Sequence, residues 1–126
     1  MKTGDHLNGK FKVLKKHLAI EVGSGTVPVL ATPALIGFME NIASDLAQKS
    51  LAPSETTVGF YIEAEHLRPT ARKQEIYIHA QITGIQEKII TFQIEAHQEE
   101  KLIGKAVHKR AIINRKEFEK KYSIFN

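Results

Sequence analysis

The sequence predicts an α+β fold in which one long helix packs against a single curved antiparallel sheet. Two observations lead to this fold class: one extended segment has helical apolar spacing, and segments on both sides of it alternate in the manner of strands. A strand, a long helix and then several strands require one sheet to cover the helix, which is an α+β arrangement. The length of 126 residues and the absence of a linker-like tract predict one domain over residues 1–126.

The N-terminal part is expected to form a strand and then the long helix. Apolar residues alternate imperfectly over residues 10–22, which indicates the strand, and GSGTVP at residues 23–28 indicates a loop. Thr32 suits the N-cap of the helix and Pro33 its first position, because the missing proline N–H would be unpaired there. Pro53 lies beyond the helix end, and the apolar stripe of the helix contains Leu35, Met39, Ile42 and Leu46.

Four strands are expected after the helix, over residues 56–66, 74–85, 88–98 and 102–113, and a short basic helix over residues 115–122. The last three strands follow one another as an antiparallel set. In the first of the four, one parity is expected to face the interior: Val58, Phe60, Ile62, Ala64 and His66. One helix leaves a face or an edge of such a sheet uncovered, so we expect a homodimer.

Composition excludes several kinds of chemistry. Without cysteine there is no disulfide, no thiolate nucleophile and no Cys-ligated metal, and the histidines lack metal-ligand spacing, so no metal or cofactor is expected. No apolar stretch reaches the ~18 to 20 residues of a membrane span. The N-terminal segment lacks the apolar run of a secretory signal, so we expect a cytoplasmic protein that does not enter a membrane.

The net charge of +4 is concentrated near the C-terminal end, where residues from Lys101 onward include eight Lys or Arg and two acidic residues. Such a cluster attracts nucleic acid, a membrane surface or a phosphorylated small molecule, and it can also be a merely solvated face. Nucleic-acid binding is disfavoured because the chain has no Trp and no basic amphipathic helix.

Four polar side chains lie in positions that could carry chemistry. Glu40 lies on the apolar face of the helix, where it either pairs with Lys or Arg or serves as a general acid or base. His66 is the last residue on the apolar face of its predicted strand, where it is either a hydrogen-bonded core residue or part of a functional site. A role as N-cap would by itself explain Thr32, although a helix N-terminus can also hold an oxyanion beside the Thr32 hydroxyl. Arg110 shares a strand parity with His108 and is otherwise a surface or ion-paired arginine.

The element order and the spacing of five residues resemble the fluoroacetyl-CoA thioesterase family of hotdog-fold proteins. The resemblance extends over nearly the whole chain and rests on ATPALIGFME (31–40), VGFYIEAEH (58–66) and IGKAVHKRAII (103–113). It implies that Thr32, Glu40 and His66 are catalytic. It implies that Gly59 and Arg110 are supporting positions that bind substrate. It also implies a hotdog homodimer with acyl-CoA sites at the subunit interface.

A thioesterase of this kind hydrolyses the acyl-CoA thioester to free acid and coenzyme A, with Thr32 as nucleophile or as a hydroxyl that orients water. Glu40 and His66 would move the proton, and the basic C-terminal end could hold the phosphates of coenzyme A. Thr32 and Glu40 are eight residues apart, ~12 Å along a helix, so a partner chain could close the gap. An Asp/His pair typical of hotdog dehydratases is not found, whereas a non-catalytic acyl-CoA-binding or sensing dimer remains the alternative.

The segment before Thr32 is short. The fluoroacetate-specific member of the family carries a longer, aromatic-containing lid there, whereas this chain has only GSGTVPVL at residues 23–30. A more open acyl pocket and activity on several short to medium acyl-CoAs are therefore expected.

Overall fold

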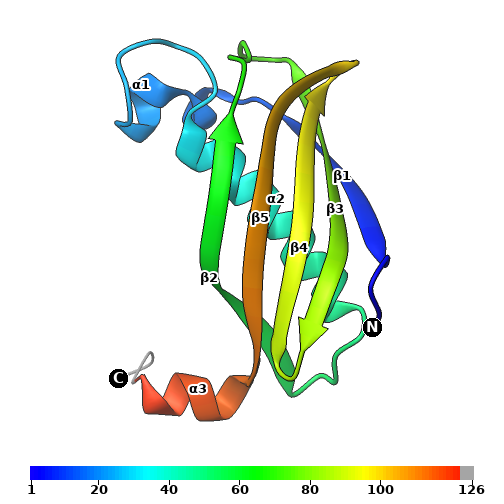
Figure 1. Ribbon diagram of the computed structural model, residues 1–126. Coiled ribbons are helices and arrows are strands. Elements are labelled where there is room, and N and C mark those ends of the chain that lie inside the picture. Colours follow the sequence, from blue (N-terminus) through cyan, green and yellow to red (C-terminus); the bar gives the residue numbers. More distant parts are fainter. Residues whose placement is uncertain (123–126) are drawn as a thin grey trace.

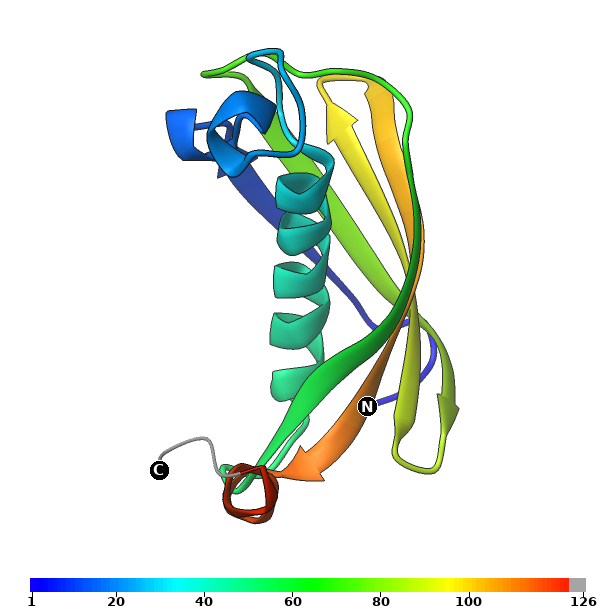
Figure 2. The ribbon, with the colours of Figure 1, turned by 90° about the vertical axis from the view of Figure 1, so that its left-hand side faces the viewer.

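The computed structural model describes residues 1–122, and its central feature is a 17-residue helix packed on a five-stranded sheet (Figure 1). The sheet order is β1-β3-β4-β5-β2, and every neighbouring pair is antiparallel. Figure 2 shows the strands curving around α2. The elements are β1 His6–Lys12, η1 Lys15–His17, α1 Ala19–Val22, α2 Thr32–Gln48, β2 Glu55–His66, β3 Glu75–Gln86, β4 Ile89–Gln98, β5 Lys101–Asn114 and α3 Arg115–Lys121.

The core lies between α2 and the concave face of the sheet. The inward residues of β3 and β4 are fully buried, and they are those that the alternation predicts: Ile76, Ile78, Ala80, Ile82, Ile90, Phe92, Ile94 and Ala96. The helix contributes Leu35, Phe38, Met39, Ile42, Ala43, Leu46 and Ala47. The long helix, the last three strands and the short basic helix are thus confirmed for the described residues, and only the last four residues of the expected domain 1–126 lie outside them.

The strand expected over residues 10–22 is wrong at both ends, because β1 begins at His6 and ends at Lys12. The ladder to β3 ends there, and the chain then turns through η1 and α1. The His17 ring accepts the backbone N–H of Leu14 at 3.0 Å, a local bond that competes with a strand. Gly23 then ends α1 in the left-handed region, at φ 85°.

Phe60 was expected to face the interior, and this expectation is wrong because β2 contains a β-bulge. Gly59 pairs with Arg110 and Tyr61 pairs with Lys109, so Phe60 is an extra residue without a partner in β5. Its side chain is 54% exposed. The extra residue reverses the parity of the strand: Thr57 and Gly59 face α2 before the bulge, whereas Ile62 and His66 do so after it.

One edge of the sheet is long and unpaired. Strand β2 has 12 residues, and in the described chain only β5 pairs with it. Tyr61 is also exposed on this strand. Among residues 1–122, no helix is both long and apolar enough to cross a membrane.

The bulge predicts different costs for removing two phenyl rings. Phe92→Ala should lower the free energy of unfolding by ~3–5 kcal/mol, because its side chain is fully buried. Phe60→Ala should cost less than about 1 kcal/mol, because the ring lies on the outer face. Urea unfolding followed by circular dichroism measures both, and equal losses would contradict the outward orientation of Phe60.

Candidate active site

The start of α2 and the end of β2 bring Thr32 and His66 together. Thr32 Oγ1 lies 2.7 Å from His66 Nδ1, a hydrogen bond between residues 34 positions apart. The expectation that Thr32 caps the helix is wrong. Ala31 occupies the N-cap without a side-chain bond, and Thr32 is the first helical residue. Its hydroxyl bonds to the imidazole instead, so the helix N-terminus carries a polar pair from two elements.

The environment of His66 favours the neutral ring. Burial lowers the pKa of His66, and the nearby backbone of Arg68 offsets this only in part. Nε2 is buried and has no hydrogen-bond partner among residues 1–122. A neutral imidazole can accept the proton of the Thr32 hydroxyl at Nδ1, which leaves Nε2 carrying the ring hydrogen.

A pocket of about 330 Å³ opens beside this pair. Its walls are the segment before α2, with Val27 and Leu30, and the chain after β2, with Leu67 and Arg68. The wall segment is tied down by backbone bonds from Leu30 N–H to the carbonyl of Thr70 and from Ala31 N–H to the carbonyl of His17. The first turn of α2 leaves N–H groups free for an oxyanion, next to the Thr32 hydroxyl.

A second polar cluster surrounds Glu40, two turns further along α2. Arg110 on β5 is buried, and it donates from Nε to Thr57 Oγ1 at 2.8 Å and from Nη2 to the Thr57 carbonyl at 3.2 Å. Its Nη1 lies 4.0 Å from Glu40 Oε2. Burial lowers the pKa of Arg110 and the Glu40 carboxylate opposes this, so the guanidinium remains a cation beside an anion.

Gly59 makes this cluster possible. A Cβ at this position would lie 2.9 Å from His108 Cε1 and 3.0 Å from both Arg110 Nη1 and Glu40 Oε2. Real Cβ atoms essentially never come closer than 3.0 Å to another heavy atom of this kind, so any side chain at this position would force its neighbours to shift. Glu40, Gly59 and Arg110 therefore converge on one small polar region.

The five sequence-predicted residues thus fall into two groups rather than one. Thr32 contacts His66, whereas Glu40 lies with Gly59 and Arg110. The eight-residue separation of Thr32 and Glu40 along α2 amounts to ~12 Å, and each side chain has its own partner. Within one chain the two groups do not form a single catalytic set.

The family model of the fluoroacetyl-CoA-specific thioesterase FlK matches residues 13–116. The chain belongs to this family. It is an acyl-CoA thioesterase, a hydrolase of thioester bonds, and its arrangement of one helix and one curved sheet is the hotdog fold. No curated protein sequence matches the chain significantly.

Solved structures of other proteins share this fold at low sequence identity. A structure of FlK is 21% identical with a TM-score of 0.93, covering 100% of this chain and 98% of the other. A hypothetical thioesterase superfamily protein from Thermus thermophilus is 20% identical with a TM-score of 0.89, covering 97% and 90%. A thioesterase from Haemophilus influenzae is 24% identical with a TM-score of 0.73, covering 87% and 73%.

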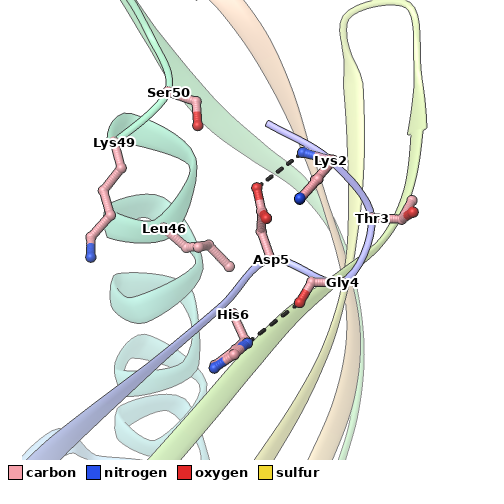
Figure 3. A pocket seen from close by; sticks show the side chains of 8 residues that line it. All are labelled: Lys2, Thr3, Gly4, Asp5, His6, Leu46, Lys49 and Ser50. Atoms are coloured by element: carbon pink, nitrogen blue, oxygen red, sulfur yellow. Dashed lines mark hydrogen bonds between the residues drawn. The ribbon is translucent and has the colours of Figure 1, made fainter.

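A larger pocket of this thioesterase, about 480 Å³, lies at the other end of α2 (Figure 3). Residues 2–6 form one wall, and Leu46, Lys49 and Ser50 form the other. Figure 3 shows Asp5 held by the backbone N–H of Lys2, a bond of 3.0 Å. This hollow contains neither polar group described above, so size does not identify the candidate site.

Sequence reasoning missed Thr57, which supplies two acceptors to Arg110. Thr57 and His66 are nine positions apart, so in a regular strand their side chains would lie on opposite faces of the sheet. Only knowledge of the bulge reveals that both residues face α2. Among residues 1–122 no group of three or more His, Asp or Glu side chains is arranged for a metal ion.

Gly59→Ala should lower kcat/KM for acyl-CoA hydrolysis about tenfold or more and leave the fold intact. The added methyl would lie 2.9 Å from His108 Cε1 and 3.0 Å from Arg110 Nη1 and Glu40 Oε2, so these side chains would have to shift. Gly84→Ala is the matched control, since Gly84 also adjoins a register shift but its Cβ would be 3.7 Å from Thr91. Free thiol release measures both variants, and equal activities would show that Gly59 is dispensable.

Proposed function

We propose that this enzyme hydrolyses short to medium acyl-CoA thioesters with Thr32, Glu40 and His66 as its catalytic residues and with Gly59 and Arg110 binding the substrate. The observation that carries the proposal is the 2.7 Å hydrogen bond between Thr32 and His66, located in a pocket at a helix N-terminus. A hydroxyl, a neutral imidazole and free backbone N–H groups are what acyl transfer to water requires.

In this mechanism the thioester carbonyl binds at the N-terminus of α2. His66 removes a proton either from the Thr32 hydroxyl or from a water that Thr32 orients, and the resulting oxygen attacks the carbonyl carbon. The backbone N–H groups stabilise the tetrahedral oxyanion. The C–S bond then breaks, and the coenzyme A thiolate takes the proton that His66 holds. If Thr32 is the nucleophile, a water hydrolyses the acyl ester in a second step.

Glu40 would share this proton transfer with His66, and it would reach the reaction from a second copy of the chain. The separation of Glu40 from Thr32 within one chain supports this arrangement, and so does the long unpaired edge of β2, which a second copy would cover. A homodimer is therefore part of the proposal. Each of its two sites would combine Thr32 and His66 of one protomer with Glu40 and Arg110 of the other.

Coenzyme A is the expected leaving group. A variant of FlK, 22% identical to this chain, has been solved with fluoroacetate and CoA. In this chain Arg68 lines the candidate pocket and is suited to the CoA phosphates, whereas the basic C-terminal helix α3 lies near the other end of α2 (Figure 1), so the basic end would have to come from the second copy. A cytoplasmic location completes the proposal, supported by the absence of cysteine.

A panel of acyl-CoAs tests the proposed reaction directly. Acetyl-, fluoroacetyl-, butyryl-, hexanoyl- and benzoyl-CoA should give kcat/KM values within roughly two orders of magnitude, since each methylene is worth only ~1–3 kcal/mol in an apolar pocket. Free thiol release is the measurement. Binding of acyl-CoA without thiol release would instead identify a non-catalytic binding protein, and a preference for fluoroacetyl- over acetyl-CoA above ~10⁴-fold would contradict the open pocket.

Activity should persist below the pH at which an ordinary histidine becomes protonated. Protonated His66 cannot accept a proton, and burial holds the pKa of His66 below its ordinary value of 6.5. The acid limb of kcat/KM should therefore have its midpoint below pH 6.5. His97→Gln, a strand histidine outside both polar groups, should leave the profile unchanged. A midpoint above 6.5 in the parent enzyme would argue against His66 as the base.

Mixed dimers test the contribution of the second copy. Thr32→Ala and Glu40→Gln should each lower kcat by ~10²- to 10⁴-fold as homodimers. Co-expressed with two different affinity tags and purified as heterodimers, they should recover about half the activity of wild type, because one of two sites is then intact.

The control heterodimer pairs Thr32→Ala with Asp45→Asn, an exposed residue on α2. This heterodimer should have about half the wild-type activity whether Glu40 acts in its own protomer's site or in its partner's, because the substitution at Asp45 leaves both polar groups intact. A Thr32→Ala/Glu40→Gln heterodimer as inactive as its parents, beside an active control, would contradict the shared site. A protein that sediments as a monomer and has full activity would also contradict the shared site.

A further inference from the structure

We infer that His108 is a positioning residue of this thioesterase: it holds the Arg110 guanidinium away from a close ion pair with Glu40, so that the carboxylate stays free to accept a proton. The inference rests on the proposed function of Glu40 and deepens it. His108 lies on β5, two residues before Arg110, and only 1% of it is exposed.

The two hydrogen bonds of the His108 ring determine where its proton lies. Nδ1 is 2.8 Å from the carbonyl oxygen of Tyr61, which can only accept, so Nδ1 carries the hydrogen. Nε2 is 3.1 Å from Arg110 Nη1, which can only donate, so Nε2 must be the acceptor. One neutral tautomer satisfies both bonds.

The surroundings of the ring maintain this neutral form. Burial lowers the pKa of His108, and the Arg110 cation lowers it further, whereas the bond to Tyr61 and the Glu40 carboxylate act in the opposite direction. The Phe92 ring stacks on the imidazole with centroids 5.9 Å apart. The acceptor atom is therefore fixed in orientation as well as in protonation state.

The guanidinium of Arg110 is consequently held by hydrogen bonds at all three of its nitrogen atoms. Thr57 binds Nε and Nη2, and His108 binds Nη1. Nη1 remains 4.0 Å from Glu40 Oε2, well beyond the ~2.7–2.9 Å of a charge-assisted hydrogen bond. Nη1 carries two hydrogens, and its bond to His108 fixes the direction in which both of them point. Without the imidazole acceptor, Arg110 would turn toward the carboxylate and occupy the oxygen that the reaction needs.

The main test compares two substitutions. His108→Leu removes the acceptor, whereas His108→Gln retains a side-chain oxygen that can accept from Arg110 and an amide that can donate. We expect His108→Leu to lower kcat about tenfold or more, and His108→Gln to restore kcat to within about threefold. His97→Leu is the matched control and should leave kcat unchanged. Folded Gln and Leu variants with equal losses would overturn the inference.

A double substitution tests whether His108 acts through Arg110. In an Arg110→Met background, His108→Leu should change kcat by less than about twofold, because there is no guanidinium left to hold. The same fold loss in both backgrounds would show a merely structural role and would overturn the inference.

A measurement without substrate separates this inference from the proposed function. Nitrogen-15 NMR should show wild-type His108 protonated at Nδ1, and the Arg110 Nη1 hydrogens, which bond to His108, should be protected from exchange in the wild type and in His108→Gln. A ring protonated at Nε2 would overturn the inference even if His108→Leu fails to fold. Absence of thiol release by the wild type would defeat the proposed function alone, because the NMR result does not depend on turnover.

Discussion

One extra residue in β2 determines which side chains can meet α2. Gly59 and His66 are seven positions apart, and in a regular strand they would face opposite sides of the sheet. The bulge at Phe60 reverses the parity between them, so that both face the helix. Without it, either the Thr32–His66 bond or the close approach of Glu40 to Gly59 would be lost. Both polar groups of the candidate site therefore depend on this local irregularity.

Burial of Arg110 explains why so many polar groups collect in one place. A guanidinium under a hydrophobic helix is costly unless its N–H groups find acceptors. Thr57 and His108 provide those acceptors, and Glu40 provides the opposite charge at 4.0 Å. The interactions that make the cation tolerable in the fold also determine its orientation, so here the requirements of stability and of site geometry coincide.

The periodicity of apolar residues is sufficient to predict the helices and strands that are regular. The alternation around Ile78 and Phe92 and the helical spacing of Leu35 correctly predict two central strands and α2, because these segments have one face toward a common core. The irregular parts could not be found in this way. The sequence pattern extends the first strand past Lys12 and directs Phe60 to the interior, because a local side-chain bond and a bulge leave no periodic signal. The positions of Thr32, Glu40, His66 and Arg110 in the sequence pattern mark them as candidates, whereas Gly59 and the assigned roles rest on a resemblance of spacing; these roles stay a prediction.

The two polar groups of the site differ in how firmly the fold holds them. Arg110 and His108 lie on β5, which is hydrogen-bonded to β4 on one side and to β2 on the other. Thr32 and His66 lie instead where elements begin and end, beside connecting segments. Amide hydrogens of strands paired on both sides open only with global unfolding, whereas element ends open locally at much lower free energy. Mild heating should therefore loosen the surroundings of Thr32 and His66 while Arg110 keeps its position, and the enzyme would lose turnover before it loses its sheet.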